Sequence, residues 1–234
     1  MKRLLSVMVT VIILLIASGC NERLNANNCP GVEIEWVDFL LINDITYYYQ
    51  PEANLDPHAT AGDEIGIVTY KLAEQACSDH RSENGDAAFL PEGTKIYEYQ
   101  GYLPTFRVIA ITAEGNKVYE VNRNPTARRV RDLYDIEHKI HRISLKEGKI
   151  ILSESETEEF TKLFLDSEYV GFDKIYKTRI ADPVSITIKL LDETSVNLTY
   201  WLRPEPAMQP GILVSDGMRS IIEGKLNEAG YLAE

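Results

Sequence analysis

The sequence predicts an α+β fold, strand-rich in its first part and mixed in its second part. Short runs of alternating apolar and polar residues, separated by turn residues, indicate strands over most of the chain. The chain has 13 Tyr against 2 Trp and 6 Phe, and Tyr suits the half-buried surface of a sheet. With 234 residues, it is long enough for one large domain or two small ones.

Residues 32–124 are expected to form a strand-rich domain, a small twisted sheet or a barrel-like unit. The strands are expected where apolar residues alternate with polar ones, and Asn43-Asp44 is expected to form a turn or a bulge within the second run. The expected runs are 32–37, 39–49, 65–72, 95–100, 106–112 and 117–122, the last two joined as a hairpin through residues 113–116.

Asn124-Pro125 marks the expected boundary, and residues 125–234 are expected to form an α+β domain with two main helices. A short helix is expected up to about Asp135, and a hairpin around Glu147-Gly148. The first main helix is expected to begin with the capping-box pattern at residues 155–158 and to end near residue 166. The remaining expected elements are strands at 184–191, 195–202 and 212–214, and a final helix at 216–228.

The first 20 residues have the organisation of a secretory leader. Lys2 and Arg3 give a positive start, residues 4–16 are almost purely apolar, and small residues at 17–19 precede Cys20. A bilayer-spanning helix needs roughly 20 apolar residues, so the apolar run is too short to span a membrane comfortably.

The run Ile16-Ala17-Ser18-Gly19-Cys20 resembles the lipobox of bacterial lipoproteins, although that family more often has leucine where this chain has Ala17. The resemblance implies that residues 1–19 are a signal peptide, that Cys20 carries a diacylglycerol, and that the new amino end is acylated, as by palmitate. Two acyl chains give a long-lived anchor. We therefore expect the extracytoplasmic face of the cell membrane as the location, with the Asn-rich residues 20–31 as a flexible tether. An ordinary cleaved signal peptide and an uncleaved anchor are the alternatives.

A second resemblance lies in the mature chain. The run GDA at residues 85–87 followed by LPEGTKIY at residues 90–97 is similar to segments of envelope lipoproteins from Gram-positive, spore-forming bacteria. Those proteins are mostly uncharacterised, so the likeness implies a location and a fold and brings no catalytic residues.

The chain is acidic, with a formal net charge of −12. This charge argues against nucleic acid as a partner and against adhesion to anionic lipid headgroups. The simpler interpretation is solubility at a crowded cell surface.

Three cysteines remain to be assigned, and lipidation would use Cys20. We predict a disulfide between Cys29 and Cys77, because export takes the chain out of the reducing cytosol. Two buried or free thiols are the alternative.

Two groups of residues share some features with metal sites. Glu137, His138 and His141 resemble a zinc-peptidase pattern in composition, but the Glu precedes both His and the two His are three residues apart. Cys77 and His80 have the spacing of half a zinc site, without a second pair nearby in sequence. We expect no metal and no other cofactor.

No motif with a catalytic mechanism is present: the sequence lacks a nucleophile elbow, a Walker loop and a Gly-x-Gly-x-x-Gly run. The acidic pairs Asp63-Glu64 and Glu158-Glu159 are expected to be solvated. The run Tyr47-Tyr48-Tyr49 could stack on a sugar or peptide, but more often such a run packs a sheet. Asn197-Leu198-Thr199 fits a glycosylation acceptor and is interpreted as strand.

We therefore expect a membrane-anchored, non-catalytic lipoprotein that binds another envelope protein or a cell-wall component. A ligand-binding receptor of an importer is one alternative, although such receptors usually have two α/β lobes. An envelope enzyme that uses scattered acids is the other, and a deep pocket with close carboxylates would favour it.

Overall fold

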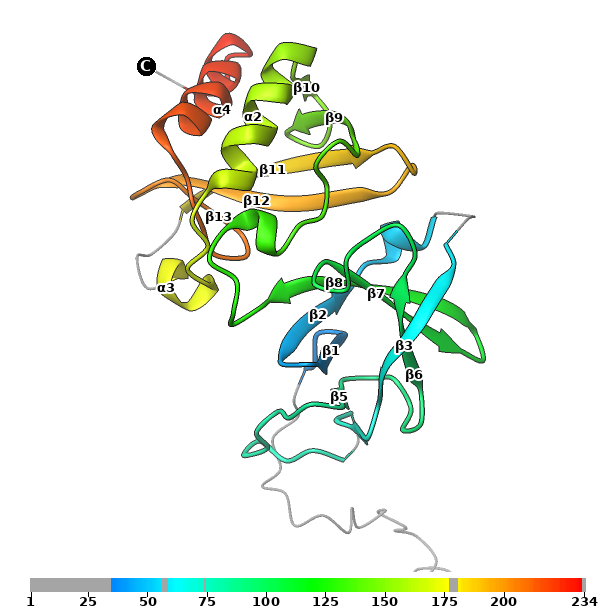
Figure 1. The fold of residues 1–234 in the computed structure, drawn as a ribbon. Helices are drawn as coiled ribbons and strands as arrows, with labels where there is room; N and C mark the ends of the chain where they lie inside the picture. The colour runs from blue at the N-terminus through cyan, green and yellow to red at the C-terminus, as the bar shows by residue number, and fades with distance from the viewer. Residues whose placement is uncertain (1–34, 56–58, 74, 177–180, 233–234) are drawn as a thin grey trace, which may run out of the picture. The chain divides into compact units, whose positions relative to one another are not determined.

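The computed structural model of the chain describes residues 35–55, 59–73, 75–176 and 181–232. Residues 35–74 and 81–234 belong to one compact unit, which contains every strand and helix named below. Residues 75–80 fall outside that unit. The fold is α+β, as the sequence predicts, with two sheets, and the α-helices among the described residues are in the second part of the chain (Figure 1).

The first sheet has eight strands in the order β3-β6-β7-β8-β2-β1-β5-β4, antiparallel except for the β4–β5 pair. The strands are β1 (Phe39–Ile42), β2 (Ile45–Tyr49), β3 (Ala61–Ile67), β4 (Tyr70–Lys71), β5 (Asp86–Ala87), β6 (Lys95–Tyr99), β7 (Arg107–Thr112) and β8 (Gly115–Arg123). A short 3-10 helix, η1 (Pro51–Leu55), follows β2.

This sheet curls into a half-barrel. Strands β3 and β4 stand at opposite ends of the strand order, yet only Val68 and Thr69 separate them in sequence. The short link forces the two ends of the sheet together. Gly66 of β3 allows a close approach to Ile42 of β1, because a Cβ at position 66 would lie only 3.0 Å from the nearest side-chain atom of Ile42. The expected barrel-like unit is confirmed.

The second sheet has six antiparallel strands in the order β10-β9-β11-β12-β13-β14. The strands are β9 (Ile140–Leu145), β10 (Ile150–Ile151), β11 (Ala181–Leu190), β12 (Ser195–Arg203), β13 (Ala207–Met208) and β14 (Ile212–Leu213). The helical segments of this part are η2 (Val130–Asp132), α2 (Glu154–Asp166), α3 (Phe172–Tyr176) and α4 (Asp216–Glu228).

The two long helices, α2 and α4, lie on the same face of the second sheet (Figure 1). Phe160 and Phe164 of α2 and Ile222 of α4 are fully buried, and they share a core with inward-facing residues such as Ile186 of β11 and Leu198 of β12. The opposite face of the sheet is left without a helix of this length, which is what creates the site described below.

Some local predictions are wrong. Glu35 to Val37 form no strand, since β1 begins at Phe39. The α2 cap is Ser153, two residues before the expected start, and its hydroxyl accepts from the amide of Glu156. Residues 125–135 contain only the 3-10 turn η2: the apolar residues there are buried by tertiary contacts instead of by a helix. The elements β13 and α3 were not predicted.

Buried residues from both expected domains share one core. The Phe106 ring meets the Tyr134 ring edge-on at 5.5 Å between centroids, and Tyr134 in turn lies 5.7 Å from Phe164. These contacts run from the first sheet to α2. The boundary at residues 124 and 125, with 32–124 and 125–234 as separate domains, stays a prediction.

Candidate functional site

The open face of the second sheet carries a row of small polar side chains. Side chains alternate between the two faces of a strand, so every second residue points away from the helices. In β11 from Val184 onward and in β12, the residues on the helix side are mostly buried and apolar, and those on the other side are polar up to Thr199. The outward polar residues are Ser185, Thr187 and Lys189 in β11, and Ser195, Asn197 and Thr199 in β12.

The strand register places these side chains opposite one another. Thr187 pairs with Asn197, and Thr187 also pairs with Ser144 of β9 on its other side. One pair further along, Lys189 lies between Ser195 and Arg142. Three neighbouring strands therefore contribute to one polar surface.

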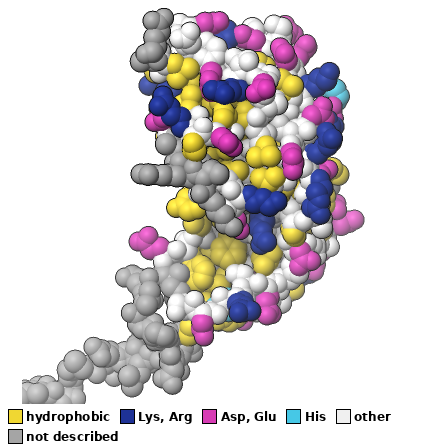
Figure 2. Space-filling model, turned by 90° about the vertical axis from the view of Figure 1, so that its left-hand side faces the viewer, with side chains coloured by type: hydrophobic (Ala, Val, Ile, Leu, Met, Phe, Trp, Pro, Cys, Tyr) yellow, Lys and Arg dark blue, Asp and Glu magenta, His cyan; other side chains and the backbone are white. Residues whose placement is uncertain are grey.

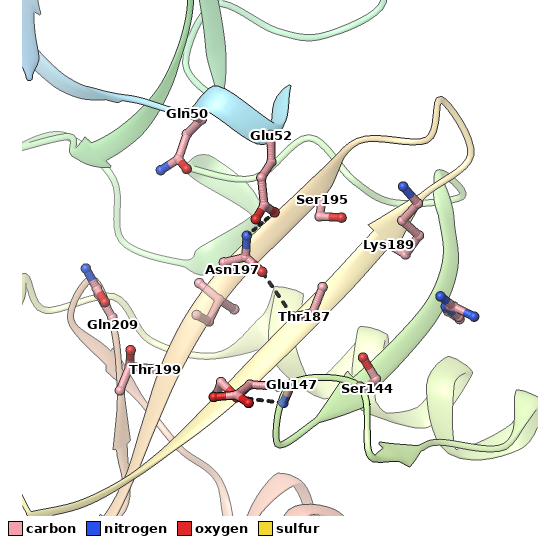
Figure 3. A pocket seen from close by; sticks show the side chains of 14 residues that line it. Gln50, Glu52, Ser144, Glu147, Thr187, Lys189, Ser195, Asn197, Thr199 and Gln209 are labelled. Atoms are coloured by element: carbon pink, nitrogen blue, oxygen red, sulfur yellow. Dashed lines mark hydrogen bonds between the residues drawn. The ribbon is translucent and has the colours of Figure 1, made fainter. Parts of the chain in front are cut away.

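The 3-10 helix η1 forms a wall over this surface and converts it into a hollow of about 750 Å³ (Figure 3). The Asn197 amide donates a hydrogen bond of 2.6 Å to Glu52 of η1, and its oxygen accepts one of 3.0 Å from the Thr187 hydroxyl. Asn197 thus joins the wall to the floor, which it can do because it can donate and accept at the same time. The volume is within the range of small-molecule sites.

Several lining side chains have no protein partner. Among the residues that the structure describes, the side chains of Gln50, Arg142, Ser195, Thr199 and Gln209 make no hydrogen bond with one another or with the rest of the chain. Hydroxyl and amide groups both donate and accept, so these groups can bond to a ligand that presents donors and acceptors. A ligand can therefore bind these side chains without breaking a hydrogen bond among the described residues.

The charges that line the hollow balance. Arg142 and Lys189 are positive, and Glu52 and Glu147 are negative. Lys189 is paired with Glu193. Its ammonium group donates a hydrogen bond to the backbone oxygen of Glu193 and lies 3.4 Å from the Glu193 carboxylate. The lining therefore has no excess of positive charge.

A buried ion pair holds the β11–β12 turn, which leads into the hollow. Arg107 is fully buried and donates to Glu120 through two nitrogens, at 3.0 and 2.9 Å. Its third nitrogen donates to the Thr194 hydroxyl at 2.7 Å, and Tyr102 donates to Asp192 of the same turn at 2.5 Å. Burial raises the pKa of Glu120, against the opposing effect of the Arg107 charge. The first sheet and the turn before Ser195 are thus fastened together.

The residues weighed for a metal site do not come together as the zinc-peptidase pattern requires. His138 lies in a turn with a φ of 62°, while His141 lies in β9, and both are exposed. Glu137 lies 3.6 Å from the guanidinium of Arg131. In the described part of the chain, no group of three or more His, Cys, Asp or Glu side chains has the arrangement to hold a metal ion.

Cys77 is disulfide-bonded, so its thiol is not a zinc ligand beside His80. Cys20 and Cys29 lie outside the described residues. Lipidation of Cys20 and the pairing of Cys29 with Cys77 both stay predictions.

The tyrosine run packs the first sheet. Tyr47 is 1% exposed and its hydroxyl donates to the backbone oxygen of Pro104 at 2.8 Å. The Tyr49 ring lies 5.7 Å from the Tyr119 ring, and Tyr48 is half-buried. Burial raises the pKa of Tyr47 and Tyr48.

The acidic pairs lie at the surface. Asp63, Glu64, Glu158 and Glu159 are exposed, and Glu64 forms a 2.8 Å ion pair with Lys95. They form no paired-carboxylate site with the hollow.

The sequence predicts the strands of the hollow and misses the hollow itself. Asn197-Leu198-Thr199 is a strand segment, as predicted, but Asn197 and Thr199 also line the site. The signal that could have revealed it is the alternation of Ser, Thr, Asn and Lys along both arms of the β11–β12 hairpin. Exposed strand faces often look like this, so the pattern becomes specific only once η1 is known to cover it.

No family model matches the chain, and no curated protein and no solved structure matches it either. Within the described residues, none of the helices has the length and apolar character to cross a membrane.

Proposed function

We propose that the protein is a membrane-anchored, extracytoplasmic lipoprotein that binds a ligand or partner of the cell envelope without catalysing a reaction. The leader and its lipobox-like end at Cys20 support the anchor. The observation that carries the binding role is the polar hollow, because several of its lining side chains make no hydrogen bond to any residue that the structure describes.

The lining favours binding over catalysis. A serine nucleophile requires a neighbouring base, and the hydroxyl of Ser195 makes no hydrogen bond to any residue that the structure describes. Of the two lining carboxylates, Glu52 already accepts a hydrogen bond from the Asn197 amide, which joins it to the floor of the hollow.

The anchor is tested by mass spectrometry of the mature amino terminus and by cell fractionation. We expect the mature chain to begin at Cys20 and to carry acyl chains, and Cys20→Ala to release the protein from membranes. Cys29→Ala is the matched control and should leave the protein at the membrane. An unmodified Cys20, or cleavage elsewhere, contradicts the proposal.

The binding role is tested in intact cells with a photo-crosslinking residue at position 209 in the hollow. The control carries the same residue at position 227, which is exposed on α4 on the other side of the sheet. We expect a discrete crosslinked species from position 209 alone. Equal labelling at both positions would contradict a binding site in the hollow.

A further inference from the structure

An aromatic cluster of one buried ring, Trp201, and two exposed rings, Phe172 and Tyr176, lies at one end of the polar row. Trp201 is two residues beyond Thr199 in β12, so the two side chains share the open face of the sheet. The Phe172 ring lies 6.0 Å from the Trp201 ring, and the Tyr176 ring lies 5.5 Å from that of Phe172.

Two of these rings are accessible to a ligand. Trp201 is 9% exposed and forms the base of the cluster, whereas Phe172 is 37% exposed and Tyr176 is 64% exposed. Aromatic side chains with one covered and one free face provide rigid contact area at a small entropic cost. The cluster can therefore stack against a flat, partly apolar ring.

The row and the cluster together have the chemistry of a sugar-binding surface. Each sugar ring presents hydroxyl groups at its rim, which require donors and acceptors, and C–H groups on its face, which stack on aromatic rings. Ser195, Thr199 and Gln209 supply the first, and Phe172 and Tyr176 supply the second. Six residue steps of about 3.3 Å separate Ser195 from Trp201, a distance of roughly 20 Å that accommodates several linked rings.

The charges of the site disfavour the binding of a strongly acidic polymer. The lining holds two cations and two anions, and one of the cations, Lys189, is already paired with Glu193 of the β11–β12 turn. The face shown in Figure 2 likewise has acidic and basic side chains interspersed among hydrophobic ones. A strongly acidic polymer would need an excess of positive charge, which the hollow does not have.

We propose that the hollow and the aromatic cluster form one binding surface for a neutral glycan chain, which lies along β12 from Ser195 to Trp201. This inference rests on the proposed binding role of the hollow and assigns its ligand class. The aromatic cluster holds the sugar faces, and the unpaired hydroxyl and amide groups replace the water around the sugar hydroxyls.

The test is a titration of the full-length protein in detergent with two neutral probes, an N-acetylglucosamine tetramer and a glucose tetramer. Binding is followed by calorimetry and by tryptophan fluorescence, since Trp201 lies in the site and Trp36 is the other tryptophan. We expect saturable binding of at least one tetramer and a change in fluorescence.

Two variants locate the site. Gln209→Ala removes an unpartnered amide, and Tyr176→Ala removes the most exposed ring of the cluster. Each should weaken binding about threefold to tenfold, the loss expected for one hydrogen bond or one stacking contact. The controls Asn227→Ala and Tyr231→Ala remove a similar amide and a similar exposed ring elsewhere, and they should leave the affinity unchanged.

Three results would overturn the inference. The first is that neither tetramer binds saturably. The second is an equal loss of affinity in the site variants and in the controls. The third is that polyglutamate or an unrelated peptide binds more tightly than the tetramers. Site-specific crosslinking from position 209 in cells, combined with any of these results, would leave the binding role standing and refute only the glycan assignment.

Discussion

We expect the two ways of breaking the buried Arg107–Glu120 pair to change the free energy of unfolding differently. The substitution Glu120→Gln leaves the guanidinium of Arg107 buried without its main counterion, and arginine cannot lose its proton to escape the cost. Breaking a buried ion pair from one side costs about 3–5 kcal/mol. Asp192 lies 3.9 Å away and is partly exposed, so we expect the lower end, about 3 kcal/mol.

The opposite substitution, Arg107→Met, behaves differently because a carboxyl group can take up a proton. Burial raises the pKa of Glu120, and the removal of Arg107 removes the influence that opposes this shift. A carboxyl group whose pKa is higher in the folded than in the unfolded state stabilises the fold at low pH. This stabilisation is lost as pH rises toward the folded-state pKa. The cost of Arg107→Met should therefore grow from about pH 4 upward, by as much as about 1.4 kcal/mol per pH unit.

Urea denaturation measures both effects. A loss of 3 kcal/mol lowers the midpoint by roughly 1.5 M at a slope of about 2 kcal/mol/M. The double variant Arg107→Met/Glu120→Leu removes both charges and should cost much less than the two single changes together. The control Lys95→Met breaks the exposed pair with Glu64 and should leave the urea midpoint almost unchanged. A cost below about 1 kcal/mol for Glu120→Gln, or additive single costs, would refute the reasoning.

Two further predictions concern the second part of the chain. Hydrogen bonds from Lys225 and from the N-cap of α2 lower the pKa of Glu156 to about 2, so its stabilising effect is present above about pH 4.5 and is lost as pH falls. Glu156→Gln should cost about 1 kcal/mol in urea melts at pH 7, and the difference from wild type should narrow below about pH 4; a constant difference would contradict this. Gly211 has a φ of 128°, and a Cβ there would lie 2.2 Å from the backbone carbon of Gly171, so Gly211→Ala should cost about 2–3 kcal/mol in the same assay. Gly224→Ala, in open space on α4, should instead stabilise the fold by up to about 1 kcal/mol. Similar changes in stability at the two positions would contradict the predicted clash between a Cβ at position 211 and the backbone of Gly171.

The hairpins were predictable because their turn residues determine them locally. Asn43 and Asp44 adopt φ angles of 52° and 63°, which Asn and Asp tolerate better than most residues, and they join β1 to β2. The helix expected before Asp135 was wrong because apolar residues at helical spacing are also buried by a 3-10 turn that other elements cover. Local pattern does not distinguish these two cases.

The ion pair shows where sequence information ends. The turn between β7 and β8 sets their register, and that register places Arg107 directly opposite Glu120. A reader of the sequence could therefore have paired the two charges. Their burial depends on Thr194 and the β11–β12 turn, 87 residues from Arg107, and no local pattern reveals that contact.

The candidate site depends on the same long-range contacts, which gives it a rigid frame. Glu52 and Asn197, which join the wall of the hollow to its floor, are 145 residues apart in sequence. The wall follows β2 of the first sheet, and the floor belongs to the second. Because the Arg107 network fastens the first sheet to the turn next to Ser195, the wall and the floor are held in place before a ligand arrives. Binding then requires little ordering of the protein, which leaves more of the contact energy for affinity.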